Sequence, residues 1–267
     1  MTFPSDGSSY IILSPIELSI RRKIEAVGKP LKEWDVHINY GIKTGCNEAF
    51  IITTEERDEL LAQCQSEEER KRTAELIRPI LRGRDIKRYS YDWAELWIIN
   101  THNGIKEEGI PPINIQEYPV LKAHLDQYRE KLQARADKGD TPYNLRNCAY
   151  IKDFDRPKII YPDICQGRPF VIEKEGYYIS NTAYFISTAN PGLLEYLVKT
   201  LNSDIMHWYY RTLSTQLGQK AMRMFSIHVL EIPIPPVSTI ALDDVIQLTP
   251  SEIDFIQSEL YAEESKI

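Results

Sequence analysis

The sequence lacks the features that mark membrane spans, disulfide frameworks and zinc sites. No apolar run approaches 18 residues, so we expect no transmembrane helix. The four cysteines lie far apart without a CxxC pair, which argues against a zinc knuckle and against a disulfide framework. The stretch "MTFPSDGSSYIILS" has neither a basic segment nor a cleavable apolar core, so no secretion signal is expected. We therefore expect a cytoplasmic protein that does not enter a membrane.

Catalytic signatures are missing as well. "GIKTG" at residues 41–45 is too short for a phosphate loop, and no G-x-S-x-G or HExxH motif occurs. The proline pairs in "GIPPIN" and "IPIPPV" lack the flanking Asn or Asp and aromatic residue that position an exocyclic amine for methylation, and no glycine-rich S-adenosylmethionine loop is visible. The five histidines have no metal-ligand spacing. We expect no catalytic residue, metal or cofactor in this chain.

Three charged residues raise the alternative of a metal-dependent nuclease. Asp163 is followed at some distance by Glu173 and Lys174. A nuclease core needs an acid, one spacer and a lysine on one strand, so that both side chains reach the metal and its water. Here the lysine follows the acid directly and falls on the opposite face of the strand. The spacing disfavours this alternative, which magnesium-dependent cleavage of plasmid by the pure protein would support.

Charge is segregated along the chain. The net charge is −7, but residues 231–267 hold eight acids against one lysine, and the rest of the chain balances 31 acids with 31 bases. The stretch "LRGRDIKRYSYDW" at residues 81–93 packs four cations into seven positions and continues with three aromatic residues. We expect it to form a local electropositive face, with the acidic segments on other faces.

Helix starts are marked by capping patterns. "SPIE" at Ser14, "SEEE" at Ser66 and "TPSE" at Thr249 each place a Ser or Thr three residues before a Glu. Apolar residues at helical spacing predict long helices over residues 119–136 and 191–213. These stripes are typical of core or helix-pairing faces.

β-Branched and aromatic runs predict strands between the helices. The expected strands are residues 49–53, 96–100, 158–162, 169–173, 177–180 and 183–187. The expected strands and helices do not alternate as repeated βαβ units do. We therefore predict an α+β fold with a mixed or antiparallel sheet and long packed helices. We divide the chain into an N-terminal helix leading into the domain (1–29), one folded domain (30–236), and a linker with an acidic C-terminal helix (237–267).

Five polar loops carry the residue types that nucleic-acid readers use. They are "INYGIKTGCNEAF", "NTHNGI", "DTPYNLRNCAY", "DICQGRPF" and "STQLGQKAMRMF". Arg and Lys meet phosphates and guanine edges, whereas Asn and Gln pair with adenine edges. Such loops, in a chain without an active site, favour recognition over catalysis.

Six long motifs follow one another along the chain: "YGIKTGCNEAFII", "ILRGRDIKRYSYDWAELWIINTHNGI", "YPVLKAHLDQYREKLQARADKGDTPYNLRNCAY", "RPKIIYPDI", "YYISNTAYFI" and "LVKTLNSDIMHWYY". Over about residues 30–236 the chain resembles the TaqI-like C-terminal specificity domain. That domain is the target-recognition part of adenine-specific DNA methyltransferases and fused type II restriction-modification enzymes. The helix followed by "IPIP" also resembles the specificity subunits of type I systems.

The resemblance implies sequence-specific binding of double-stranded DNA, mostly in the major groove. A catalytic methyltransferase or endonuclease domain, in cis or in trans, would flip an adenine and methylate its N6 with S-adenosylmethionine. The alternative from another class is an interaction module that pairs by its long helices with a methyltransferase subunit. A stable hetero-complex without DNA affinity would favour that alternative.

The resemblance also divides the candidate DNA-binding residues into two groups. Motifs shared by the whole family cannot read a DNA target sequence that differs between relatives, so their residues should hold phosphates or serve the fold. Arg82 and Asp85 could equally form a structural ion pair. Arg168→Ala should then relax base preference, and Lys87→Ala should weaken all DNA alike. The phosphate or fold candidates are Tyr40, Lys43, Thr44, Arg82, Arg84, Lys87, Arg88, Asn103, Tyr143 and Arg146. The base-reading candidates, in the variable loops, are Gln166, Arg168, Gln216, Gln219, Lys220 and Arg223.

Overall fold

The computed structural model describes residues 13–214, 216–217 and 221–264. The helices are α1 Pro15–Val27, α2 Asn47–Phe50, α3 Thr54–Ala62, α4 Glu67–Leu76, α5 Pro119–Asp126, α6 Arg129–Ala134, α7 Pro191–Leu201, α8 Asp204–Leu213, α9 Ser226–Val229, α10 Leu242–Ile246 and α11 Pro250–Glu264. Short 3-10 helices are η1 Leu31–Glu33, η2 Gly83–Asp85, η3 Lys106–Glu108, η4 Ile115–Glu117 and η5 Ile151–Asp155. Within the described ranges, no helix is long and apolar enough to cross a membrane.

In the described part of the chain, the strands are short and form five small sheets. They are β1 Lys29–Pro30, β2 His37–Tyr40, β3 Ile51–Thr53, β4 Ile77–Leu81, β5 Ile86–Lys87, β6 Ser90–Tyr91, β7 Leu96–Ile99, β8 Lys158–Pro162, β9 Ile164–Cys165, β10 Val171–Glu173, β11 Tyr178–Ile179, β12 Ala183–Ser187, β13 Gln216–Leu217, β14 Ala221–Arg223 and β15 Pro233–Ile234. The central sheet has the antiparallel order β10-β8-β12-β2, and the upper sheet has the mixed order β11-β4-β7-β3. A three-stranded sheet, β13-β14-β9, and the pairs β1-β15 and β5-β6 complete the set. The predicted α+β class is confirmed.

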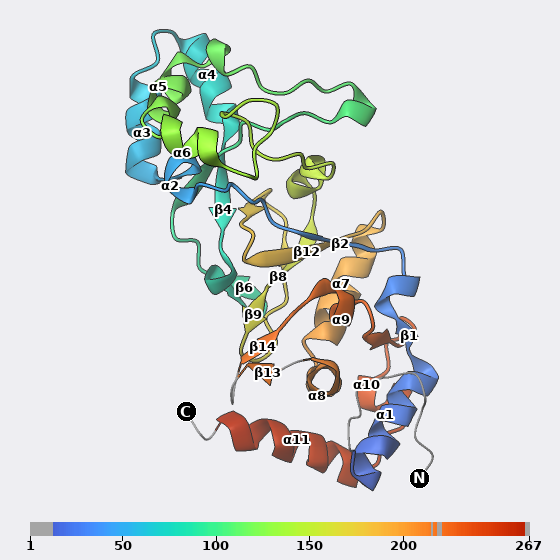
Figure 1. Ribbon diagram of the computed structural model, residues 1–267. Helices are drawn as coiled ribbons and strands as arrows, with labels where there is room; N and C mark the ends of the chain where they lie inside the picture. Colours follow the sequence, from blue (N-terminus) through green and yellow to red (C-terminus); the bar gives the residue numbers. More distant parts are fainter. Residues whose placement is uncertain (1–12, 215, 218–220, 265–267) are drawn as a thin grey trace.

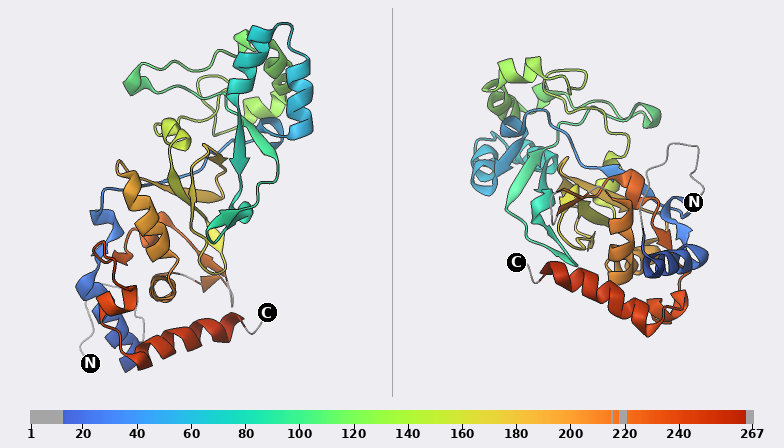
Figure 2. Two further views of the ribbon diagram at one scale, coloured as in Figure 1. Left: turned by 180° about the vertical axis from the view of Figure 1, so that it is seen from behind. Right: turned by 60° about the horizontal axis from the view of Figure 1, so that its bottom comes forward.

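The molecule is elongated, with an upper and a lower half on either side of the central sheet (Figure 1). Helices α2 to α6 gather in the upper half, and α1 with α7 to α11 gather in the lower half; the views from behind and from below show the same division (Figure 2). The first and last described helices, α1 and α11, both lie at the lower end of the molecule.

The central sheet separates two hydrophobic cores because neighbouring residues of a strand point to opposite faces. In β8, Ile159 and Tyr161 belong to the lower core, whereas Ile160 between them belongs to the upper core. In β12, Phe185 belongs to the upper core and Ile186 to the lower. A sheet covered on both faces needs continuous apolar strands, and "KIIYP" and "AYFIS" have that character.

The predicted capping boxes at both ends of the chain are present. The Ser14 side chain accepts a hydrogen bond from the Glu17 amide, and the Glu17 carboxylate accepts one from the Ser14 amide (2.6 Å). Thr249 and Glu252 repeat this arrangement at the start of α11. These bonds satisfy amide groups that the first turn of a helix leaves without partners.

Both long helices predicted from apolar stripes are interrupted. Residues 119–136 form α5 and α6, and residues 191–213 form α7 and α8. The Ser203 side chain caps α8. Asn202 just before it uses its side-chain amide to bond the backbone N–H and C=O of Phe170 (3.2 and 2.7 Å). Side-chain bonds to backbone groups compete with a continuous helix, and a residue-spacing argument does not see them.

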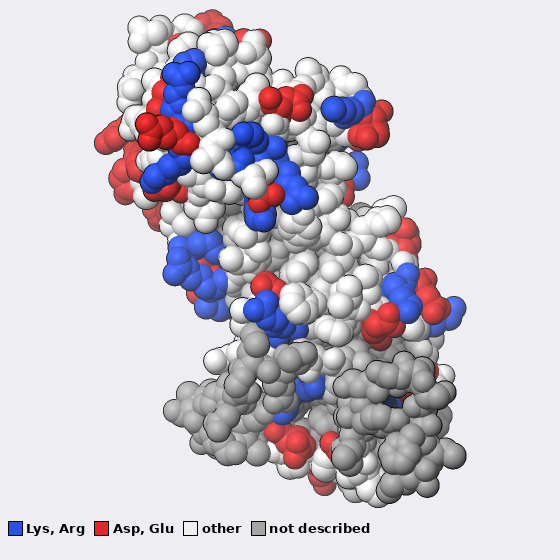
Figure 3. Space-filling view, viewed as in Figure 1, with Lys and Arg blue, Asp and Glu red and all other residues white. Residues whose placement is uncertain are grey.

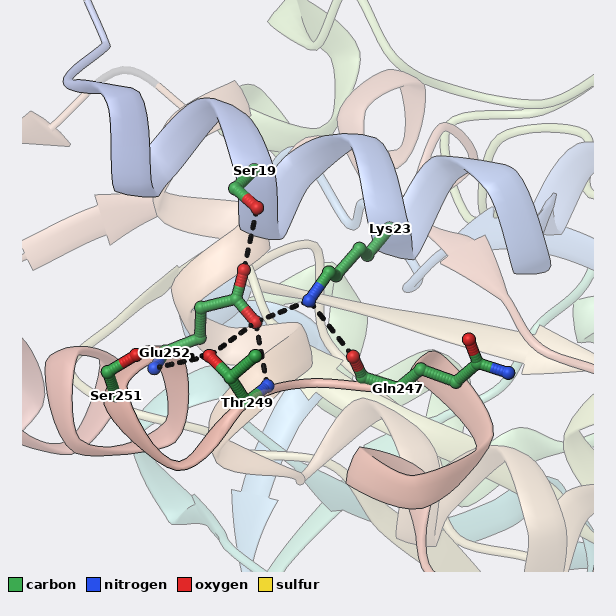
Figure 4. Close-up of polar contacts among 6 residues, drawn as sticks. All are labelled: Ser19, Lys23, Gln247, Thr249, Ser251 and Glu252. Atoms are coloured by element: carbon green, nitrogen blue, oxygen red, sulfur yellow. Dashed lines mark hydrogen bonds and ion pairs between the residues drawn. The ribbon is translucent and has the colours of Figure 1, made fainter.

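A polar network around the buried Glu252 joins α1 to α11 (Figure 4). The Glu252 carboxylate accepts hydrogen bonds from Ser19 Oγ and Lys23 Nζ (both 2.7 Å) and from the Thr249 amide. Lys23 also donates to the Gln247 carbonyl (3.0 Å). The N-terminal and C-terminal segments thus lie side by side in the lower half. The boundaries at residues 29 and 236 stay predictions.

Candidate nucleic-acid interface

A cleft of about 560 Å³ lies where the upper and central sheets meet. An isolated parallel bridge between Ile42 and Ser180 joins the two sheets at this point. Its lining combines isoleucine and leucine side chains with arginine, asparagine, serine, threonine and aspartate side chains. Four motifs that are far apart in the sequence contribute its walls: residues 42–47, 80–84, 163–164 and 180–182.

Two glycines allow these motifs to approach each other. A Cβ atom on Gly41 would lie 2.1 Å from the Ser180 carbonyl oxygen, and one on Gly83 would lie 2.3 Å from the Thr182 carbonyl oxygen. The Gly83 amide also donates to Thr182 Oγ1 (2.8 Å). Because any side chain would collide with backbone here, both glycines serve the fold.

Arg82 forms the structural ion pair that the sequence left open. Its Nε and Nη2 donate to the two carboxylate oxygens of Asp85 (2.9 and 2.7 Å), and its amide donates to the same carboxylate (2.8 Å). Asp85 is buried, and its hydrogen bond raises the pKa of Arg82. This bidentate pair fixes the start of η2.

The next three cations belong to a basic hairpin, defined here as residues 84–91. Arg84, Lys87 and Arg88 are all exposed. Lys87 Nζ donates to the Arg84 carbonyl (3.2 Å), and Arg88 Nη2 donates to the Asn202 carbonyl (2.9 Å). In the described part of the chain none of the three is paired with a carboxylate. Figure 3 shows Lys and Arg side chains gathered at the left edge of the molecule, at the height of β6.

A second group of cations surrounds one acid beside the GIKTG loop. Lys43 and Arg146, both partly exposed, contact the two oxygens of Asp137 at 2.6 and 3.3 Å. The hydrogen bond from Lys43 lowers the pKa of Asp137. The two cations outnumber the acid, so this group keeps a net positive charge.

Arg135 is a site residue that sequence reasoning missed. It is buried, donates to the carbonyls of Thr44, Pro142 (2.7 Å) and Asn144 (2.9 Å), and lies over the Phe50 ring at 4.7 Å. It therefore ties the GIKTG loop to the "DTPYN" loop. Thr44 and Phe50 lie far from it in the sequence and the other two acceptors are backbone carbonyls, so nothing in the local sequence distinguishes it from a surface arginine.

Two of the candidate contact residues are turned inward. Thr44 is buried, and its hydroxyl donates to the Asn47 side chain (2.6 Å). Asn103 is also buried, donates to the Asp140 carboxylate (2.9 Å) and accepts from the Asp140 amide (2.7 Å). The sequence allowed either a phosphate contact or a role in the fold for these residues. The contacts favour the role in the fold.

The two tyrosines among the candidates differ in exposure. Tyr143 is half-buried and its hydroxyl donates to Asp126 (2.5 Å). Tyr40 is exposed, with its ring 6.4 Å from the Tyr150 ring in an edge-on arrangement. Part of Tyr40 is thus accessible to a ligand.

The two loops assigned to base reading lie next to each other. The first reader loop, residues 166–168, follows β9, and the second reader loop, residues 216–223, contains β13 and β14. Strand β14 pairs with β9, which places Met222 opposite Cys165 and Arg223 opposite Ile164. Ile164 also lines the cleft, so the paired strands β9 and β14 adjoin it.

The base-reading candidates are placed as follows. Gln166 is exposed next to Gly167, whose φ of +82° marks a tight turn. Arg168 is ion-paired with Asp204, and only 14% of its side chain is exposed. Arg223 Nη1 lies 3.9 Å from Asp163. Gln219 and Lys220 lie outside the described residues, and of Gln216 only the backbone is described.

A comparison with protein families identifies the family of this chain. The model of the TaqI-like C-terminal specificity domain matches residues 78–234, more than half of the chain. The chain belongs to this family. The matched residues of this specificity domain run from β4 to β15 and include the basic hairpin and both reader loops.

Relatives of this specificity domain occur in larger proteins. The chain is 24% identical over 234 residues to the type II methyltransferase M.PaeR7I of Pseudomonas aeruginosa. The matched region covers 85% of this chain and 37% of that protein. The type IIG restriction endonuclease BpuSI has a similar fold, with a TM-score of 0.58, 12% identity, and coverage of 94% of this chain and 32% of that one. The type IIL restriction-modification enzyme MmeI, solved in complex with DNA, also has a similar fold, with a TM-score of 0.54 and 15% identity. The match covers 88% of this chain and 33% of that one. The chain thus spans about a third of the length of each.

Proposed function

We propose that this TaqI-like specificity domain binds double-stranded DNA and reads its sequence. One observation carries the proposal: Arg84 of the basic hairpin and Ile164 of β9 line the same cleft, and β14 of the second reader loop pairs with β9. Gln166 of the first reader loop is exposed directly after β9, and among the described residues the cations of the basic hairpin have no carboxylate partner. Phosphate contacts fix the register of a protein on DNA, and base-edge contacts supply specificity, so the two kinds of side chain need to be neighbours.

The charge distribution supports the same role. The C-terminal acids lie on α10 and α11 in the lower half, and α11 carries Glu252, Asp254 and Glu259. The basic hairpin is instead anchored at the central sheet and the start of α8, through Asn202. The negative net charge is therefore compatible with DNA at the reader loops, and contacts of the cations with phosphates should make the affinity fall steeply with salt.

We also propose that the chemistry lies outside this chain. The name of M.PaeR7I and the titles of the BpuSI and MmeI structures describe methyltransferase and restriction enzymes about three times as long. A methyltransferase part, or a fused methyltransferase and endonuclease, would act on an adenine chosen by this domain, in cis or in trans. S-adenosylmethionine would bind in that part.

Selection from a randomised duplex pool at low salt tests the proposal. The purified chain retains duplexes, and sequencing of the retained pool gives an enriched motif of roughly four to seven base pairs, the length that two small loops can cover. Retention without enrichment would mean that reading needs the catalytic part. Failure to retain any duplex would overturn the proposal and favour the interaction module.

A further inference from the structure

The turn of the basic hairpin holds an unusual residue. Arg88 and Tyr89 form the two-residue loop between β5 and β6, closed by the pairing of Lys87 with Ser90. Tyr89 has a φ of +61°, in the left-handed region, and its side chain is 51% exposed. Two-residue hairpin loops normally place Gly, Asn or Asp at such positions because a bulky side chain is costly there. The fold therefore tolerates a strained, exposed tyrosine where a glycine would be easier.

The backbone of this turn is held firmly, whereas the tyrosine ring is not. The Tyr89 amide donates to the Phe170 carbonyl (3.1 Å), and the neighbouring Arg88 donates to the Asn202 carbonyl. The Arg88 guanidinium lies 5.2 Å from the centre of the Tyr89 ring. No described residue hydrogen-bonds the Tyr89 hydroxyl. The turn thus presents the ring to solvent without using it for packing against the core.

The other two aromatic residues of this stretch behave differently. Tyr91 and Trp93 each place their ring 5.4 Å from the Tyr177 ring, at the edge of the upper core. Their contribution to the fold is therefore evident. Tyr89 is the member of the trio that faces outward.

The location of Tyr89 indicates what its ring meets. Phe170, which binds its amide, follows the first reader loop by two residues, and Arg84 of the same hairpin lines the cleft. Exposed Lys87 stands beside it. An exposed aromatic ring edged by cations suits the surface of a duplex, because the deoxyribose rings and the thymine methyl group offer apolar contacts next to the phosphates.

We propose that the Tyr89 ring packs directly on a base or deoxyribose of the bound duplex, while Arg84 and Lys87 hold the adjacent phosphates. The inference rests on the proposed function and adds a contact that hydrogen-bond readout does not supply. Such a contact is independent of salt, because it releases no counterions. The turn, held through the Tyr89 amide and Arg88, directs the side chain away from the hairpin into solvent before DNA arrives.

Three variants and one matched control test this contact. Tyr89→Gly removes the ring and relieves the left-handed strain, so the protein unfolds at an equal or higher temperature but binds duplex roughly 5- to 100-fold more weakly. Tyr89→Asn, which also accepts this conformation, gives a similar loss, and Tyr89→Phe stays within a factor of ~2 because the ring is kept. Gln247→Gly removes another exposed residue of positive φ (+59°), beside α1, and leaves DNA binding unchanged.

The salt dependence separates this contact from the cations around it. Tyr89→Gly and the unchanged protein have the same slope of log affinity against log salt, whereas Lys87→Ala lowers the slope by about one. Unchanged affinity in well-folded Tyr89→Gly would overturn the inference while leaving the proposed function intact. A reduced slope in Tyr89→Gly would also overturn it, because the loss would then come from displaced cations. A wild-type protein that binds no duplex would overturn both proposals.

Discussion

Lys158 and Glu173 face each other across strands β8 and β10 and form an ion pair in which both side chains are completely buried. The remaining groups of the pair are also satisfied. Lys158 Nζ donates to the Phe154 carbonyl (2.6 Å), and the Glu175 amide donates to Glu173 (2.5 Å). Burial lowers the pKa of Lys158, and the Glu173 carboxylate opposes this effect. The pair locks the register of the edge strand β10.

Breaking this pair from one side should be costly. Glu173→Gln keeps the shape of the side chain but leaves a buried lysine without its counter-charge, so we expect a loss of about 3–5 kcal/mol in the free energy of unfolding. Urea denaturation measures this change. Glu195→Gln is the matched control, because it breaks the exposed Lys174–Glu195 pair nearby and should cost at most about 1 kcal/mol. Equal effects of the two changes would contradict the assignment.

The same pair bears on the nuclease alternative. The Glu173 carboxylate is committed to Lys158 and is fully buried, whereas Lys174 points to Glu195 at the surface. A metal-dependent nuclease needs its carboxylates at a site that water and a phosphodiester can reach. The sequence argument from strand faces and the structure agree that Glu173 and Lys174 lie on opposite sides of β10.

The network around Glu252 should make the junction of α1 and α11 sensitive to acid. Burial raises the pKa of Glu252, but hydrogen bonds from Lys23, the Thr249 backbone and Ser19 outweigh it and lower the pKa from 4.5 to about 2. A depressed carboxyl pKa contributes stability that is complete above pH 4.5 and is lost as the pH falls toward 2. Glu252→Gln should therefore cost about 1.5–3 kcal/mol at neutral pH, and the difference from the unchanged protein should shrink below pH 4.5.

Urea denaturation at a series of pH values between 7 and 2.5 checks this behaviour. Asp254→Asn is the control, since it removes an exposed charge from the same helix. It should cost little at any pH. A pH-independent cost of Glu252→Gln would show that the carboxylate of Glu252 does not exert this effect.

Strands and caps could be predicted because their causes are local. "KIIYP" forms β8 over the predicted residues 158–162, since β-branched residues favour a strand and Pro162 ends it. Ser14 and Thr249 cap helices because each has a glutamate three residues later. The break at Asn202 could not be predicted in this way. It depends on Phe170, which lies 32 residues earlier in the chain.

The composition of the candidate site could be predicted from the sequence, but its spatial arrangement could not. The basic character of residues 84–88 is visible in the sequence, and so is the polar composition of the reader loops. Their adjacency is not, because it follows from the pairing of β14 with β9. The ion pair of Arg168 with Asp204 likewise joins residues from separate segments. Local composition identifies which side chains suit DNA, and long-range pairing decides which of them are available.

Arg135 provides a test of how the loops beside the cleft are supported. Arg135→Lys keeps the charge but cannot reach the carbonyls of Thr44, Pro142 and Asn144 together, because an ammonium lacks the planar fork of a guanidinium. We expect a loss of about 2–4 kcal/mol in the free energy of unfolding, since buried carbonyls lose their donors. Arg146→Lys, at an exposed site, should cost far less. Thermal and urea denaturation of both variants compare them directly, and similar losses would contradict the role of Arg135.

Gln166 and Lys87 should affect DNA binding in different ways. Gln166 is exposed on the first reader loop, where its amide can donate and accept at the edge of an adenine, and Lys87 is an exposed cation of the basic hairpin. Gln166→Ala should lower discrimination at one base position by about 1–3 kcal/mol, and Lys87→Ala should weaken all duplexes alike. Arg168→Ala should relax base preference as well, but its interpretation requires a stability measurement because Asp204 loses its partner. Competition binding against single-base variants of the selected site resolves the three effects. If Gln166→Ala weakens every duplex by the same factor, the first reader loop contacts the backbone and does not read bases.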